Sequence, residues 1–337
     1  MKIGIVGAGS MGRVHLPAWD SLKSIGAEPV GIIANRIDST ASDLAKQYGL
    51  RLYDHYEGLL ADVDVVDLCV PTDIHAAMTI QAAQAGKHII CEKPIALSVQ
   101  DGRAMIDACN HAGVRLFIAM VLRFVPQYSA AQQVVSSGEI GDVCVMRLTR
   151  AAYQPRKATD NWFMDEQRSG GMVVDLMIHD FDYARWLGGN VTRVFAKSVR
   201  TTRPDAPGDY ALVTLRFADG AIAHIEGGWA YPAGIFRTSL DIAGREGVLE
   251  WSSDTTDTLH THLANAPAQV AADVGLPASG AAESPFLTEL RHFYQALVNN
   301  QPSNVTALDG LAALQIALAV RESLQTGRSV AVNQEAI

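Results

Sequence analysis

The first third of the chain alternates between two spacings of hydrophobic residues. Short apolar runs, rich in β-branched side chains, occupy residues 2–6, 29–34, 63–70, 88–91 and 115–119. Amphipathic segments, in which apolar residues recur at helical spacing, lie between them at residues 39–48, 74–85 and 99–111. The apolar runs show no polar alternation, as expected of strands that helices cover on both faces. We therefore predict that residues 1–120 form a doubly wound parallel sheet, a Rossmann-type α/β domain.

Beyond residue 120 the pattern is of a different kind. Helical spacing covers residues 126–137 and a long stretch at 170–187, and a strand pattern covers residues 142–152. Between 191 and 251 several strands follow one another, separated by turn signals. This arrangement favours a predominantly antiparallel sheet with one open face. Residues 121–337 are thus predicted to form an α+β domain.

The C-terminal part contains one long loop and two helices. Residues 263–284 are rich in Ala, Pro, Ser and Gly, which is typical of a loop. Ser284 and Pro285 suit the start of a helix, and a second helix is expected at residues 307–326, before Gly327. Both helices are expected to pack back on the first domain.

A glycine-rich turn follows the first predicted strand and opens a helix. It reads Gly7-Ala8-Gly9-Ser10-Met11-Gly12. Gly7 permits the tight turn, Gly9 lets a pyrophosphate approach the backbone, and Gly12 allows the helix to pack closely on the strand. The first helical turn, including Ser10 and Met11, supplies free N–H groups and the positive end of a dipole. This context predicts dinucleotide binding rather than a merely structural turn.

The end of the second predicted strand bears on the choice between NAD and NADP. An acidic residue about 20 positions after the glycines would bond the ribose 2′-hydroxyl and repel a 2′-phosphate. Here Asn35 and Arg36 stand at that place. Arg36 could pair with a phosphate, which favours NADP. If Arg36 is a solvated loop residue, either cofactor fits.

Glu92, Lys93 and Pro94 follow the fourth apolar run. Ligands bind at the carboxyl ends of the strands in parallel sheets, so this turn faces the expected cofactor. The proline restricts the backbone and aims Lys93 in one direction. A surface lysine in an ordinary salt bridge is the alternative. A role in proton transfer, or in polarising a hydroxyl, is the functional interpretation.

A second polar cluster lies in the long helical stretch. Asp175 and His179 stand four residues apart, and Asp182 follows three residues later, so one regular helix would place all three on one face. The cluster suits a buried, hydrogen-bonded core histidine equally well as a general acid/base oriented by a carboxylate. Two ligands are too few for a zinc site, so no metal is expected.

Composition narrows the classes of function. The chain has 27 Lys and Arg against 36 Asp and Glu, a formal charge of −9, and lacks the basic field that nucleic acid or an anionic membrane attracts. No apolar stretch has the length of a membrane span, and the N-terminal apolar run is too short for a secretory signal. The four cysteines show no CxxC spacing, which favours reduced thiols in the cytoplasm.

Several of these motifs together resemble the glucose–fructose oxidoreductase/inositol dehydrogenase (Gfo/Idh/MocA) family. The resemblance extends over essentially the whole chain, and EKP with D-x-x-x-H is its most specific part. The matching segments are GAGSMG with His15 behind it, Pro71 with His75, AGKHIICEKPIA, Arg123-Phe124 with Pro126, NWFMDEQRSGGMVVDLMIHDFDYARWLGG, and ESPFLTELRHFYQAL with DGLAALQIALAVRESLQTGRSV.

The resemblance implies an NAD(P)-dependent oxidoreductase that transfers a hydride between nicotinamide and a hydroxyl or carbonyl carbon of a sugar, inositol or related polyol. His179 would be the acid/base, Lys93 would bond the reacting oxygen, and Asp175 would position or tune them. Further implied cofactor contacts are Pro71, Thr72, His75, Glu92, Lys93 and Arg123. The family also implies a homo-oligomer, a dimer or tetramer formed through the sheet of the second domain.

Substrate contacts are expected on the loop before the catalytic stretch. Tyr153 and Trp162 offer rings that suit stacking on a sugar. Arg123 either bridges cofactor and substrate or pairs with an acid between the two domains. Lys93, Asp175 and His179 complete the expected substrate contacts. Two alternatives remain: an NAD-dependent glycosidase that acts by transient oxidation, and a non-catalytic sensor of NAD(P) or sugar.

Overall fold

The computed structural model describes residues 1–34, 39–155, 160–199, 210–231, 235–253, 260–263 and 283–332. The chain divides into two compact units, each formed by two segments. The first combines Met1–Phe124 with Glu283–Leu311, and the second combines Val125–Ala282 with Ala312–Ile337. No helix in the described part of the chain is both long and apolar enough to cross a membrane.

The first unit contains a six-stranded sheet in which all neighbouring strands are parallel. The strands are β1 (Lys2–Val6), β2 (Glu28–Ile33), β3 (Arg51–Tyr53), β4 (Val65–Leu68), β5 (His88–Glu92) and β6 (Leu116–Ala119). Their order is β3-β2-β1-β4-β5-β6, so the strand order reverses between β1 and β4. This is the predicted doubly wound sheet, and ligands of such sheets bind where the order reverses.

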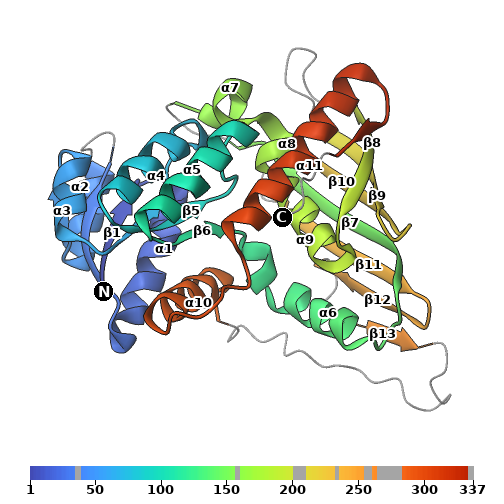
Figure 1. Ribbon diagram of the computed structural model, residues 1–337, viewed down its shortest axis with the longest axis horizontal. Coiled ribbons are helices and arrows are strands. Elements are labelled where there is room, and N and C mark those ends of the chain that lie inside the picture. The colour runs from blue at the N-terminus through green and yellow to red at the C-terminus, as the bar shows by residue number, and fades with distance from the viewer. Residues whose placement is uncertain are drawn as a thin grey trace. The chain divides into compact units, whose positions relative to one another are not determined.

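Helices connect these strands along the chain (Figure 1). They are α1 (Ser10–Ser21), α2 (Ser39–Tyr48), α3 (Tyr56–Asp62), α4 (His75–Gln84) and α5 (Val99–Ala112), with the short 3₁₀ helices η1 (Leu22–Ile25) and η2 (Thr72–Ile74). A third 3₁₀ helix, η3 (Val121–Phe124), follows the last strand, β6. The sequence pattern missed β3 and α3. Both are too short, at three and seven residues, to show a periodicity of their own.

A helix from the C-terminal part of the chain completes the first unit. Helix α10 (Pro285–Val298) packs against α1, and the ring of Phe293 stacks on Phe117 of β6 at a centroid distance of 4.9 Å. The next helix, α11 (Ala307–Thr326), begins in the first unit and continues in the second. The first unit is therefore built from segments far apart in the sequence, as the hydrogen bond from Arg115 to the carbonyl of Ala296 shows.

The second unit contains an eight-stranded sheet of order β13-β12-β11-β7-β10-β9-β8-β14. Its strands are β7 (Val143–Tyr153), β8 (Val191–Val199), β9 (Tyr210–Phe217), β10 (Ile222–Tyr231), β11 (Arg237–Gly244), β12 (Gly247–Ser252), β13 (His260–Leu263) and β14 (Val330–Ala331). Strands β7 and β10 are parallel, and the other neighbouring pairs are antiparallel. The prediction of a predominantly antiparallel sheet is confirmed.

One face of this sheet is covered and the other is open. Helices α8 (Gly171–Asp175) and α9 (Ile178–Gly188) pack on the central strands, and α6 (Pro126–Ser137) packs on α9. On the other face Phe195, Leu212 and Ile222 are between 37% and 47% exposed. The alternation of buried and exposed residues along β9 follows from this arrangement.

The predicted continuous helix over residues 170–187 is wrong. The short helix α7 (Glu166–Ser169) ends before this segment, which contains α8 and α9 with Leu176 and Met177 as a turn between them. The amide of Met177 donates to the carbonyl of Met172, five residues earlier, which widens the helix at this point. Asp175 and His179 are therefore not related by one regular helical turn. The predicted loop at residues 263–284 begins with Leu263, which belongs to β13, and residues 264–282 lie outside the described residues.

Candidate active site and cofactor cradle

The glycine-rich turn after β1 is shaped by close backbone contacts. A Cβ on Gly7, whose φ is +111°, would lie 2.2 Å from the carbonyl oxygen of Cys69. A Cβ on Gly12 would lie 2.0 Å from the carbonyl oxygen of Gly7. Beside Gly9, in contrast, there is open space. The turn therefore packs tightly against β4 while Gly9 leaves its outer side accessible.

Helix α1 begins at Ser10 directly behind this turn. Its first turn, which includes Met11, carries no acidic residue, and no side chain caps its N–H groups. At the end of the adjacent strand β4, Pro71 precedes Thr72, whose buried Oγ1 has no hydrogen-bond partner among the described residues. Uncapped N–H groups and an unpaired hydroxyl fit a dinucleotide phosphate. Asn35 and Arg36, which bear on NADP, lie outside the described residues.

The Lys93–Pro94 peptide bond is cis and stands at the carboxyl end of β5. His75, fully buried in α4, supports this turn: its Nδ1 lies 2.8 Å from the Pro94 carbonyl and its Nε2 lies 3.0 Å from the Val70 carbonyl. Burial lowers the pKa of His75. Both ring nitrogens face backbone oxygens, so we assign His75 to the support of the turn that carries Lys93.

Arg123 is buried within the first unit. Its guanidinium donates to the carbonyl of Asn304 at 2.7 Å and forms an ion pair with Asp309 at 3.3 Å. Both partners belong to the C-terminal segment of the same unit. Arg123 therefore pairs with an acid, but the expectation of a partner in the other domain is wrong, because Asp309 belongs to the same unit.

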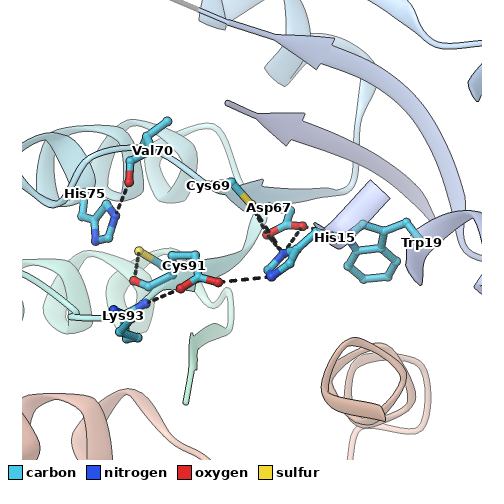
Figure 2. A network of polar contacts seen from close by, with 9 residues as sticks. His15, Trp19, Asp67, Cys69, Val70, His75, Cys91 and Lys93 are labelled. Atoms are coloured by element: carbon cyan, nitrogen blue, oxygen red, sulfur yellow. Dashed lines mark hydrogen bonds and ion pairs between the residues drawn. The ribbon is translucent and has the colours of Figure 1, made fainter. Parts of the chain in front are cut away.

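Buried polar side chains near the carboxyl ends of β4 and β5 form a network of contacts that the sequence pattern did not predict (Figure 2). His15 of α1 places Nδ1 2.9 Å from Asp67 and Nε2 3.1 Å from Oε1 of Glu92. Trp19 donates from Nε1 to Asp67 at 2.7 Å, and the backbone amide of Lys93 donates to Oε2 of Glu92 at 3.2 Å. A polar chain thus connects the core of the first unit with the Glu92–Lys93 turn. His15 in the first helix and the charged Asp67 inside the apolar run of β4 were the available signals.

Asp175 and His179 lie in the second unit. Asp175 ends α8 and is buried, and His179 is half-buried in the first turn of α9 with its Nδ1 atom inside the protein. Gly170 and Gly171 open α8, both with positive φ, and a Cβ on Gly170 would lie 2.6 Å from Cβ of Val174. These glycines allow the sharp entry into α8.

The turn before His179 is fixed by the sheet below it. Asp180 receives two hydrogen bonds from Arg150 of β7, at 2.6 and 3.0 Å, and both side chains are buried. A Cβ on Gly227 of β10 would lie 2.5 Å from Cγ of Met177, so the absence of a side chain there admits Met177. Sequence reasoning missed Arg150 and Gly227. A charged residue and a glycine inside apolar strands were the available signals.

The expected substrate residues also lie in the second unit. Tyr153, at the end of β7, is 42% exposed. Trp162 stacks on Phe163 at a centroid distance of 4.0 Å, in the 3₁₀ helix η4 (Trp162–Met164). The structure thus groups Glu92 and Lys93 in one unit, and Asp175, His179, Tyr153 and Trp162 in the other.

A parallel sheet with a glycine cradle at its switch point, followed by a unit with an open-faced sheet, defines a class of two-unit NAD-binding oxidoreductases. Residues 1–120 match the family model "Oxidoreductase family, NAD-binding Rossmann fold", and residues 128–250 match "GFO/IDH/MocA C-terminal domain". The chain belongs to the GFO/IDH/MocA family of oxidoreductases, and the resemblance seen in the sequence is confirmed.

Named relatives match along nearly the whole chain. D-apiose dehydrogenase of Paraburkholderia graminis is 31% identical over 98% of this chain and 89% of its own length. Myo-inositol 2-dehydrogenase of Thermotoga maritima is 29% identical over 99% of both chains. The solved structure of levoglucosan dehydrogenase in complex with NADH and levoglucosan has a TM-score of 0.88 and 25% identity, covering 99% of this chain and 100% of that chain.

Proposed function

We propose that this protein is a dehydrogenase or reductase that uses a nicotinamide cofactor to interconvert a hydroxyl and a carbonyl group on a sugar, an inositol or a related polyol. The observation that carries the proposal is the Glu92–Lys93 turn, which stands at the end of β5 in the same sheet as the Gly7–Gly12 cradle. The named relatives act on apiose, inositol and levoglucosan, all polyhydroxylated compounds.

The proposed cofactor contacts follow the switch point of the sheet. Gly9 admits the pyrophosphate, and the free N–H groups of α1 bind it. Thr72 offers its unpaired hydroxyl as a further hydrogen-bond partner. The proposed set is Gly7, Gly9, Ser10, Met11, Gly12, Pro71, Thr72, Glu92 and Lys93. NAD agrees with the description of the matching family model, and NADP, favoured by Asn35 and Arg36, stays a prediction.

Three side chains carry the proposed proton chemistry. The bound nicotinamide supplies or accepts the hydride. During oxidation of a hydroxyl, His179 takes the hydroxyl proton at Nε2, because Nδ1 is the ring nitrogen buried in the protein. Lys93 donates a hydrogen bond from Nζ to the reacting oxygen, and Asp175 orients the substrate and the imidazole. In reduction His179 returns the proton to the same oxygen. Trp162 and Tyr153 are proposed to contact the sugar ring.

We further propose that copies of the chain associate through the open face of the second unit's sheet. The support is the set of large apolar side chains that β8, β9 and β10 expose there. We also propose a cytoplasmic location. Its support is that all four cysteines are free thiols, three of them buried.

The His179→Ala variant tests the proposed reaction. We expect turnover, followed by the absorbance of reduced nicotinamide across a panel of sugars and polyols with both cofactors, to fall about 10²–10⁴-fold. The dissociation constant of NADH should stay unchanged. His111→Gln, an exposed histidine at the end of α5, is the matched control.

Unchanged turnover in His179→Ala would remove this histidine from the mechanism. If the wild type binds NADH but converts no substrate in bulk, the proposed function fails. Release of sugar from glycosides would then indicate the glycosidase, and binding without reaction would indicate the sensor.

A further inference from the structure

Three elements of the first unit surround His15 with ionisable groups. Asp67 and Cys69 come from β4 and the residue after it, Glu92 ends β5, and Glu289 lies in α10. All of these side chains are buried, and His15, Asp67 and Glu289 are fully so. A group of charges in a protein core is costly unless its members neutralise one another. The stability of this group therefore depends on which of its members carry protons.

His15 carries the positive charge of the group. Burial alone would lower the pKa of His15, but the Asp67 carboxylate and its hydrogen bond raise that pKa well above the ordinary value. The protonated imidazole then has two N–H groups. Nδ1 faces Asp67 at 2.9 Å, and Nε2 forms the ion pair with Glu92 at 3.1 Å. Trp19 donates to Oδ2 of Asp67, the same oxygen that Nδ1 of His15 contacts, so Asp67 is held by two partners and the other ring nitrogen of His15 faces Glu92.

Glu289 covers the group from the side of α10. Phe286 stands one turn before it, and its ring lies 6.0 Å from the His15 ring, which places this face of α10 over His15. Neither carboxyl oxygen of Glu289 has a hydrogen-bond partner among the described residues. Burial, reinforced by the negative charges of Glu92 and Asp67, raises the pKa of Glu289 well above the ordinary value. Glu289 is thus the neutral member of the group.

Glu92 is the member of this buried group that stands at the carboxyl end of β5, and ligands of doubly wound sheets bind at the carboxyl ends of the strands. In a doubly wound sheet the β2 side binds the ribose of the adenosine half, so the nicotinamide half lies toward β4 and β5. We infer that His15 is a positioning residue: its ion pair fixes the Glu92 carboxylate, and through it the Lys93 turn, for the nicotinamide half of the cofactor. The inference rests on the proposed function only in its use of a nicotinamide cofactor.

Metal binding is the competing interpretation of the same side chains. Ligand atoms of His15, Asp67 and Cys69 lie within 4.8 Å of one another. However, Nδ1 of His15 lies 2.9 Å from Oδ2 of Asp67, and Trp19 donates to the same oxygen at 2.7 Å, so these ligand atoms already face partners within the protein. The hydrogen-bonded arrangement therefore accounts for the contacts without an ion.

The experiment compares two replacements of His15 that keep different contacts. His15→Gln retains a donor near the position of Nε2, and His15→Asn retains one near Nδ1 but withdraws from Glu92. We expect His15→Asn to weaken NADH binding, measured by titration calorimetry, about tenfold or more, because Glu92 then loses the ion pair that holds its carboxylate. His15→Gln should bind NADH with an affinity closer to that of the wild type than His15→Asn does. His111→Gln is the exposed control, and melting temperatures report on folding.

A double-mutant cycle separates positioning from a general structural role. Because His15 acts through Glu92, the His15→Asn/Glu92→Gln protein should bind NADH no more weakly than Glu92→Gln alone. Independent, additive losses would overturn the inference, as would equal losses in His15→Gln and His15→Asn. Stoichiometric zinc in the purified protein, by elemental analysis, would also overturn it.

If His15→Asn does not fold, a measurement on the wild-type protein still tests the role of His15. NMR of the histidine ring nitrogens should show one imidazole that remains doubly protonated above neutral pH, with an Nε2 signal that moves in Glu92→Gln and on addition of NADH. A neutral His15 at neutral pH would contradict the inference. These readouts involve no sugar or polyol, so they are independent of whether the proposed reaction is correct.

Discussion

Glu289 lies fully buried in α10, and its two carboxyl oxygens have no hydrogen-bond partner in the described part of the chain. Since burial and the neighbouring Glu92 raise its pKa, the folded protein holds a proton that the unfolded chain releases above about pH 4.3. A group that binds its proton more tightly in the folded state makes folding less favourable as the pH rises. Glu289 therefore lowers the free energy of unfolding of the first unit as the pH rises.

Replacing Glu289 by Gln should remove that dependence. Between pH 5 and the raised pKa, the free energy of unfolding of the wild type should fall relative to Glu289→Gln by up to about 1.4 kcal/mol per pH unit. Urea denaturation at a series of pH values measures the difference. Glu283→Gln is the control, because Arg291 lowers the pKa of Glu283, which is therefore ionised in both states over this range. Parallel curves for wild type and Glu289→Gln would show that Glu289 is not protonated in the core.

At the scale of elements, strand β7 carries two arginines with contrasting surroundings. Arg150 and Asp180 form a buried, two-pronged pair that fixes the start of α9, next to His179. Arg147 pairs with Asp241 on the other face, where its side chain is 58% exposed. Both are Arg–Asp pairs, but Arg150 donates from two nitrogens in the core, whereas Arg147 donates from one nitrogen at the surface.

We expect Arg150→Leu to lower the free energy of unfolding by about 3–5 kcal/mol, because it leaves the Asp180 carboxylate buried without a partner. Arg147→Leu should cost about 0–1 kcal/mol, as for an exposed ion pair. Thermal and urea unfolding of both variants provide the comparison. Equal effects would mean that Asp180 finds another partner, and that the start of α9 does not depend on Arg150.

At the scale of the whole molecule, the formal charge of −9 favours solubility and is not the means of cofactor binding, since the cofactor is itself an anion. The exposed face of the second unit's sheet is a different feature. Leu212, Phe195 and Ile222 present large apolar surfaces to solvent in the single chain, as an interface between copies does.

A charge placed on this face should oppose association. We expect light scattering after size-exclusion chromatography to give a dimer or tetramer for the wild type and a lower mass for Leu212→Lys, because a buried lysine without a partner is costly. Val298→Lys, at an exposed position of α10 in the first unit, should keep the wild-type mass. A wild-type monomer would contradict the proposed association.

The sequence determined much of this molecule by itself. Apolar periodicity predicted the parallel sheet and helices α6 and α11, and the glycine spacing predicted the turn before α1. These features depend on neighbours within a few residues, so local sequence contains the necessary information. The EKP and D-x-x-x-H motifs also marked Lys93, Asp175 and His179 as candidate catalytic residues.

Only the tertiary structure decided which ionisable groups meet in the core and where helices break. The helix expected over residues 170–187 is interrupted at Leu176 and Met177, where Gly227, about 50 positions away, admits the Met177 side chain. His15, Asp67, Glu92 and Glu289 come together from α1, two strands and α10, so nothing in local spacing announces their contact. Protonation depends on burial and on charges a few ångströms away, and folding brings such charges together from distant parts of the chain.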